Sequence, residues 1–246
     1  MISIALEKFK LTGKVAVVTG AKGKLGQVWV KALEQAGAKV VRLDLPEVDV
    51  TDRASLVTFA QTVGPVDILI NNAGIDQPPG PAKTYRLEDF SADVFRKVLD
   101  VNLVGAFLCM QVFGKGMCER KQGSIINIGS LYASVSADER FYNHLKTDPP
   151  FLKPPAYGAS KAALVQLTKH FSTHWGKYNV RVNTLSPGGI EGGQDADFKR
   201  KFSDRVPLGR LGEAADLTGP LLFLASDASS YMTGQELRID GGFTAW

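Results

Sequence analysis

Short β-branched runs alternate with longer amphipathic segments along most of this 246-residue chain. The short runs predict strands, and the segments with apolar residues three and four positions apart predict helices. Strands that are apolar throughout and alternate with helices indicate a parallel sheet covered on both faces. The predicted strands are residues 14–19, 39–43, 66–71, 124–128, 180–185 and 236–239. The predicted helices are residues 25–36, 52–63, 94–119, 156–178 and 214–225.

The join after the second predicted strand departs from this alternation. The strand ends at Asp44, and residues 48–50, the natural candidate for a next strand, begin four positions later. A parallel crossover needs about a dozen residues or more, so no helix fits between them. We expect this strand to be vestigial, or the chain to reach the sheet edge by a short irregular loop with a trimmed helix layer. The fold expected is a single α/β domain over residues 1–246, a Rossmann-type doubly wound parallel sheet with a shortened crossover.

Composition excludes several classes of protein. Apolar residues make up 44% of the chain and charged residues 22%, which is ordinary for a soluble domain. The net charge of +4 is not concentrated in an aromatic-interleaved stripe, so no nucleic-acid partner is expected. No apolar run predicts a membrane span, and the N-terminus lacks the apolar core of a signal peptide, so we expect a cytoplasmic protein. Cys109 and Cys118 lie about 13 Å apart along one predicted helix and are expected to stay reduced.

A glycine-rich turn lies between the first predicted strand and the first predicted helix, with glycines at positions 20, 23 and 26. Glycines there let the backbone turn sharply and approach a pyrophosphate, which the helix N-terminus then holds. A tight turn without a ligand is the alternative. Asp44 ends the second strand, where a carboxylate accepts hydrogen bonds from ribose hydroxyls and repels a 2′-phosphate. Lys22, Lys24 and Arg42 lie nearby and could bind that phosphate, but Asp44 favours NAD over NADP.

Tyr157 and Lys161 are four residues apart in a predicted helix and therefore lie on one face of it. An unperturbed tyrosine has a pKa of about 10, too high for a base at neutral pH. A cation held close to the phenolate lowers that pKa. Such a pair, with Ser130 upstream, could exchange a proton with an alcohol or ketone near neutral pH.

These motifs occur in the order found in the short-chain dehydrogenase/reductase family, which the chain resembles nearly end to end. The remaining matches are Asn71-Asn72-Ala73-Gly74, Asp49-Val50, Asn102, Pro187-Gly188, Thr233-Gly-Gln and Asp240-Gly-Gly. The resemblance implies cofactor contacts from Gly20, Gly23, Leu25, Gly26, Asp44, Asp49, Val50, Asn72, Ala73, Gly74, Tyr157, Lys161, Pro187, Gly188 and Ile190. It also implies a homotetramer that uses the two long predicted helices as interfaces.

The resemblance further implies a catalytic tetrad. Tyr157 would be the general acid and base, while Lys161 would lower its pKa and bind the nicotinamide ribose. Ser130 would hydrogen-bond the substrate oxygen, and Asn102 would connect Lys161 to solvent through a water molecule. Hydride would pass between the substrate carbon and the nicotinamide, and no metal is expected.

Three segments depart from the family pattern. The glycine spacing, with Lys24 after Gly23, resembles longer family members that carry a substrate domain for which this chain has no room. Ser130 and Tyr157 stand 27 residues apart, farther than is usual in the family. We expect the inserted segment (residues 134–155) to roof the substrate pocket or form an oligomer contact, with an inert surface loop as the alternative. The candidate substrate contacts are Tyr132, Phe141, Tyr142, His144 and Lys146.

The third departure follows Gly188, where no threonine is placed to hold the carboxamide. We expect Ile190 backbone groups to hold it, and Gly192 and Gly193 to act as hinges of a mobile substrate loop, residues 188–206. The Pro-Gly-Gly-Ile pattern resembles a branch associated with bacterial surface-sugar pathways, which implies a sugar-like substrate.

The leading hypothesis is an NAD-dependent oxidoreductase that transfers hydride between nicotinamide and a small polar or sugar-like secondary alcohol or ketone. One alternative is an NADPH-dependent 3-oxoacyl-type ketone reductase, against which Asp44 argues. The other is a catalytically silent NAD-binding protein, against which the complete tetrad argues.

Overall fold

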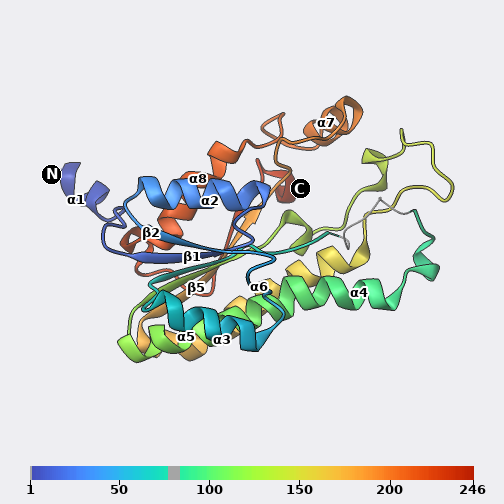
Figure 1. The fold of residues 1–246 in the computed structure, drawn as a ribbon. Helices are drawn as coiled ribbons and strands as arrows, with labels where there is room; N and C mark the ends of the chain where they lie inside the picture. The colour runs from blue at the N-terminus through green and yellow to red at the C-terminus, as the bar shows by residue number, and fades with distance from the viewer. Residues whose placement is uncertain (1, 77–83) are drawn as a thin grey trace.

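A six-stranded parallel sheet forms the centre of the protein (Figure 1), in a computed structural model that describes residues 2–76 and 84–246. The strands lie in the order β2-β1-β3-β4-β5-β6. Their bounds are β1 Val15–Thr19, β2 Lys39–Leu43, β3 Ile68–Asn71, β4 Gly123–Ile128, β5 Val180–Pro187 and β6 Glu236–Ile239. The six predicted strands and the doubly wound fold are therefore confirmed.

Helices cover both faces of the sheet (Figure 1). On one face α2 and α8 bury Trp29, Leu33, Leu217 and Leu221 against β1, β3 and β4. On the other face α3, α5 and α6 form a second core that includes Leu56, Met110 and Phe171. The helices are α1 Ile2–Glu7, α2 Lys24–Gln35, α3 Arg53–Val63, α4 Ala92–Leu99, α5 Ala106–Arg120, α6 Pro155–Trp175, α7 Ala196–Ser203 and α8 Ala214–Ala225. Short 3-10 turns occupy Leu87–Asp89, Leu131–Ala133, Glu139–Phe141, Gly176–Tyr178, Asp227–Ser229 and Phe243–Ala245.

The shortened crossover takes the form of an irregular loop. Residues 48–50 form no strand, and the chain passes from β2 by a turn, closed by Val48 N–H donating to the Asp44 carbonyl, directly into α3. Val48 and Val50 are nevertheless buried in the second core, where they contribute apolar surface without forming strand hydrogen bonds to β2 or another strand. Of the two forms expected for this join, the structure has the irregular loop, and β2 is the sheet edge.

The long predicted helix is interrupted at its centre. α4 and α5 are joined by a π-helical turn, Asp100–Gly105. Together they make a 29-residue helix, Ala92–Arg120, which contains an 18-residue stretch with a mean hydropathy of 1.4, high enough for a membrane span. Cys109, Met110, Phe113 and Met117 on this helix are buried against the sheet, so its apolar character is that of a core helix. Both cysteines are free thiols.

Two helices lie outside the sequence expectations, α1 at the N-terminus and α7 within residues 188–206. α7 packs on the inserted segment through a third core, in which Phe141 meets Phe198 and Phe202. Loop and helix thus stand beside each other at the end of the sheet where the strands finish (Figure 1). The mobility of residues 188–206 stays a prediction.

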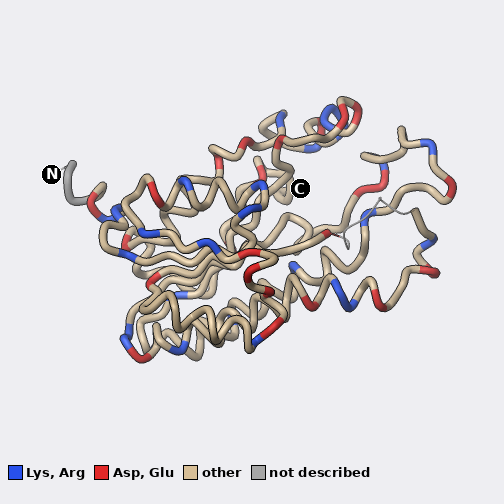
Figure 2. The backbone as a smooth tube through the Cα atoms, in the orientation of Figure 1, with Lys and Arg blue, Asp and Glu red and all other residues tan. Residues whose placement is uncertain are grey.

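Charged residues of both signs are interspersed over helices and loops, and the central strands carry few of them (Figure 2). Over the described residues, Figure 2 shows no long stripe of one sign. The absence of a nucleic-acid partner stays a prediction.

Candidate active site

A cleft of about 1090 Å³ opens at the carboxyl end of the strands, the edge at which doubly wound sheets bind ligands. Most of the predicted site residues line it: Gly20, Gly23, Leu25, Asp44, Asp49, Val50, Asn72, Ala73, Gly74, Ser130, Tyr132, Tyr142, Tyr157, Lys161, Pro187, Gly188 and Ile190. Five predicted residues lie behind or outside its wall: Gly26, Asn102, Phe141, His144 and Lys146.

The glycine-rich turn brings the backbone into the cleft. Gly20 has a φ of 62°, and a Cβ there would lie 2.8 Å from the Ala73 Cα. A Cβ on Gly26 would lie 2.1 Å from the Gly20 carbonyl oxygen, so neither position accepts a larger residue. Among the described residues, no side chain caps the N-terminus of α2. Its first N–H groups therefore face the cleft with the positive end of the helix dipole, which fits a pyrophosphate.

A buried polar network fixes this turn to the end of β3. Thr19 Oγ1 accepts hydrogen bonds from the backbone N–H groups of Asn72 and Ala73, both at 3.0 Å. The Asn72 amide donates to the carbonyls of Thr19 and Gly20 at 3.0 Å and accepts from Trp29 Nε1 at 2.8 Å. Every polar atom of the Asn72 side chain is thus used, which holds both walls of the cofactor end in register.

Replacing Thr19 with Val should lower the free energy of unfolding by about 1–3 kcal/mol, because two buried N–H groups lose their acceptor at nearly constant side-chain volume. Urea denaturation followed by circular dichroism measures the change. Thr19→Ser keeps the hydroxyl and should cost less than Thr19→Val. A larger loss in Thr19→Ser than in Thr19→Val would show that the methyl group, not the hydroxyl, holds the turn.

Asp44 is fixed at the far end of the cleft. One carboxylate oxygen accepts from Lys22 N–H at 2.6 Å, and the other accepts from Leu45 N–H at 2.8 Å. These bonds orient the carboxylate at the end of β2, the position from which an acidic side chain reaches a ribose.

The three nearby cations are each engaged elsewhere. Lys22 Nζ pairs with Glu47 at 2.8 Å, Arg42 pairs with Glu34 at 2.8 Å, and Lys24 Nζ donates to the Glu191 carbonyl at 2.6 Å. Glu47 adds a second acidic side chain beside Lys22. Two of the three cations are thus paired with carboxylates, and Lys24 contacts a neutral carbonyl.

Tyr157 lies near the start of α6, and both Tyr157 and Ser130 line the cleft. The pKa of Tyr157 is raised to about 12, chiefly by burial and further by the charge of Asp76, while the Ser130 side chain acts in the opposite direction. Ser130 Oγ accepts from the Tyr132 N–H at 3.2 Å, which fixes the serine at the end of β4. Ser130 and Tyr157 together form the Ser130–Tyr157 unit of the cleft.

Lys161 follows Tyr157 one turn later along α6 and is only 4% exposed. Its ammonium group lies 5.6 Å from the centre of the Tyr157 ring and donates to the Ile128 carbonyl at 2.7 Å. Burial lowers the pKa of Lys161 to about 8. The expected lowering of the Tyr157 pKa by Lys161 is not found in this structure, because burial of the phenol outweighs every favourable contact.

Asn102 lies in the π-helical turn behind the cleft wall. Its side chain accepts from Ile75 N–H at 2.7 Å, and donates to the Ile75 carbonyl at 2.9 Å and to Ser160 Oγ at 3.0 Å. A Cβ on Gly74 would lie 3.2 Å from Asn102 Oδ1 and 3.6 Å from Lys161 Nζ, so these groups are close neighbours. Asn102 thus ties the segment after β3 to α6, and its water-relay role stays a prediction.

The substrate end of the cleft contains the predicted Tyr132 and three residues that the motifs did not single out. Tyr132 stands edge-on to Tyr157, with ring centres 6.4 Å apart. Phe151 and Lys153 come from the inserted segment, and Asp76 follows β3. The only sequence signal for Phe151 and Lys153 was their place in the inserted segment.

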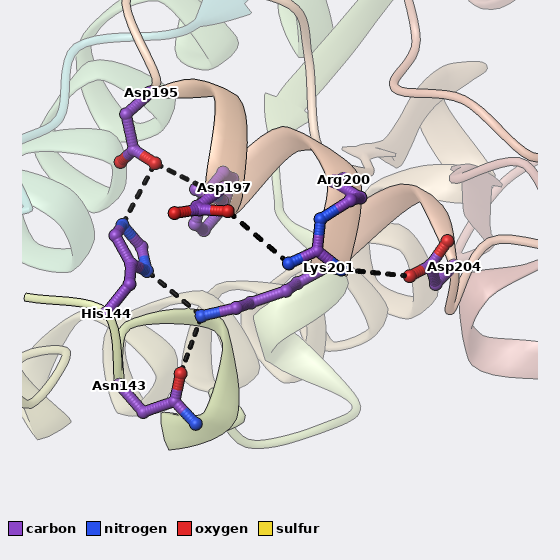
Figure 3. A network of polar contacts seen from close by, with 8 residues as sticks. Asn143, His144, Asp195, Asp197, Arg200, Lys201 and Asp204 are labelled. Carbon is purple, nitrogen blue, oxygen red and sulfur yellow. Dashed lines mark hydrogen bonds and ion pairs between the residues drawn. The ribbon is translucent and has the colours of Figure 1, made fainter.

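Phe141 and His144 join the inserted segment to α7 instead of facing the cleft. His144 lies between Asp195, at 2.9 Å from Nε2, and the ammonium group of Lys201, at 3.1 Å from Nδ1 (Figure 3). Lys201 also donates to Asn143 Oδ1 at 2.5 Å. Phe141 is 2% exposed in the third core, and Lys146 is exposed on the surface.

Known proteins resemble the chain over nearly its whole length. The sequence profile described as enoyl-(acyl carrier protein) reductase matches residues 4–244. The galactitol 2-dehydrogenase of Rhizobium johnstonii is 33% identical over 270 aligned residues, covering 98% of each chain. The NAD-dependent glycerol dehydrogenase of Listeria innocua is 32% identical, with 96% of each chain covered.

Solved structures share the same fold. A short-chain dehydrogenase of Leptospira borgpetersenii with bound NAD+ aligns with a TM-score of 0.84 and 32% identity, covering 97% of this chain and 95% of that one. A gluconate 5-dehydrogenase of Burkholderia cenocepacia, in complex with NADP and tartrate, aligns with a TM-score of 0.82 and 29% identity, covering 98% and 99%. The predicted family is confirmed. With its nucleotide-binding turn, its Ser130–Tyr157 unit and Lys161 in one cleft, the chain belongs to the short-chain dehydrogenase/reductase family of NAD(P)-dependent oxidoreductases acting on CH–OH groups.

Proposed function

We propose that the protein is an NAD-dependent dehydrogenase that oxidises a secondary hydroxyl of a small sugar or polyol, and reduces the corresponding ketone in reverse. The observation that carries this proposal is a single cleft with a fixed carboxylate, Asp44, at one end and the Ser130–Tyr157 unit at the other. The relatives named galactitol and glycerol dehydrogenases support a polyol as substrate.

The side chains divide the proton chemistry among them. Ser130 hydrogen-bonds the substrate oxygen, and the Tyr157 phenolate takes the proton from that oxygen during oxidation. The Lys161 ammonium group, 5.6 Å from the centre of the Tyr157 ring, would offset part of the burial that raises the pKa of this phenol. The hydride leaves the carbon carrying the hydroxyl, and the acceptor for it would be supplied by bound NAD. The electron pair of the broken O–H bond then forms the carbonyl.

The cofactor preference rests on the cations being engaged. Asp44 presents a negative charge where a 2′-phosphate would lie, and Glu47 adds to it. Relatives use either cofactor, as the NAD-dependent glycerol dehydrogenase and the NADP complex of gluconate 5-dehydrogenase show. Asp44 is the residue of this chain that decides between them.

Calorimetric titration should show NADH binding at least about tenfold more tightly than NADPH, because the phosphate faces a like charge. Asp44→Ala should weaken NADH binding and remove most of the difference. Asp93→Ala, on the exposed side of α4 and outside the cleft, is the control and should change neither affinity. Tighter binding of NADPH by the unaltered protein would instead favour the 3-oxoacyl-type ketone reductase.

The homotetramer and the cytoplasmic location implied by the sequence stay predictions. Analytical ultracentrifugation of the full chain measures the first directly.

A further inference from the structure

An ion pair that the catalytic chemistry does not use lies at the substrate end of the cleft. Lys153 Nζ is 2.5 Å from Asp76 Oδ2, and both residues line the cleft. The two side chains are 23% and 41% exposed. Lys153 belongs to the inserted segment and Asp76 follows β3, so the pair bridges two separate walls of the pocket.

This pair lies beside the Tyr157 ring, which carries the proposed proton acceptor. Lys153 Nζ lies 5.5 Å from the centre of the Tyr157 ring and 6.0 Å from that of Tyr132. The Asp76 carboxylate is close enough to help raise the pKa of Tyr157, Tyr132 and Tyr142. A substrate whose hydroxyl contacts Tyr157 therefore presents its neighbouring groups to Asp76 and Lys153.

A buried oxygen of this pair has hydrogen-bonding capacity to spare. Asp76 Oδ1 meets no donor within residues 2–76 and 84–246. A buried acceptor of this kind is costly unless a donor reaches it. Hydroxyl groups of a ligand are such donors.

The charge of the pair selects among ligands. Asp76 neutralises Lys153, so the carboxylate of a sugar acid placed beside this pair would meet a like charge. A neutral polyol offers a donor to Asp76 Oδ1 and an acceptor to Lys153. We propose that Asp76 and Lys153 form a hydroxyl-recognition site that selects neutral polyols over sugar acids. This inference rests on the dehydrogenase function proposed above.

The test compares kcat/KM for galactitol and for gluconate with NAD, in the unaltered protein and in three variants. The unaltered protein should favour galactitol at least about tenfold, the worth of a hydrogen bond to a charged group. Asp76→Asn keeps the shape but leaves Lys153 unpaired. It should lower the value for galactitol about tenfold and raise the value for gluconate about tenfold. Lys153→Met should lower both. Asp93→Asn breaks an ion pair outside the cleft and should change neither.

Binding separates this inference from the proposed reaction. Calorimetry with the enzyme–NADH complex should detect galactitol and not gluconate, and Asp76→Asn should reverse this order with NADH affinity unchanged. If galactitol binds in that order but is not oxidised, the proposed reaction is wrong and the recognition site stands. Preference of the unaltered protein for gluconate, or an unchanged order in Asp76→Asn, would overturn the recognition site.

Discussion

Replacing Tyr157 with Phe should lower turnover of any accepted alcohol by about 10²- to 10⁴-fold, the usual contribution of a general acid or base. The variant loses the group that takes the substrate proton, while the ring and its packing against Tyr132 remain. NADH affinity should change little by comparison, because the turn at Gly20 and the Asp44 carboxylate are untouched. Steady-state kinetics and calorimetric titration measure the two effects separately.

Tyr178→Phe is the matched control for this variant. Tyr178 is an exposed tyrosine in the turn after α6, outside the cleft, and its loss of a hydroxyl should leave kcat and KM unchanged. Turnover in Tyr157→Phe within tenfold of the unaltered enzyme would contradict the assignment of Tyr157 as the proton acceptor.

Replacing Lys161 with Met should abolish most turnover and yet stabilise the fold at neutral pH. Burial lowers the pKa of Lys161 from 10.5 to about 8, so the folded protein holds this proton less tightly than the unfolded chain. At pH 7 the charge therefore costs about 3 kcal/mol of folding free energy, and removing it should raise the free energy of unfolding by up to that amount. Loss of the bond to the Ile128 carbonyl reduces the gain.

The pH dependence distinguishes this cause from better packing. Between about pH 8 and pH 10.5 the unfolded chain binds more protons at this site than the folded one, so the unaltered protein gains stability as pH rises. The advantage of Lys161→Met should therefore shrink over that window and vanish above it. Urea denaturation at several pH values measures it, with Lys169→Met, on the exposed side of the same helix, as control. A constant advantage at every pH would contradict the buried-charge account.

The sheet could be predicted from the sequence because its central strands are short apolar runs that can be recognised from adjacent residues alone. The buried runs at 68–71 and 124–128 fall within the predicted strands, and β5 merely extends two residues farther than expected. The absence of a strand at residues 48–50 was also foreseeable, because the join after Asp44 is too short for a helical crossover.

α7 could not be predicted, because its burial depends on a distant segment. Phe198 and Phe202 are its main apolar anchors, and the aromatic surface that covers them includes Phe141, nearly sixty residues earlier. The Asp76–Lys153 pair was missed for the same reason, since the partners are 77 positions apart. Tyr157 shows a different limit of prediction from sequence. The spacing places Lys161 on the same helix face, but only the structure shows that burial controls the pKa of Tyr157.

The shared core of the inserted segment and α7 also bears on how such a pocket can be exchanged between proteins. Phe141 packs on Phe202 and Phe198, and His144 contacts Asp195 and Lys201. The inserted segment and α7 therefore each depend on the other for their packing. Grafting residues 134–155 alone onto a relative would leave the Phe141 ring without the aromatic side chains on which it packs. We expect that the two stretches of chain must be transplanted together for either of them to keep its structure.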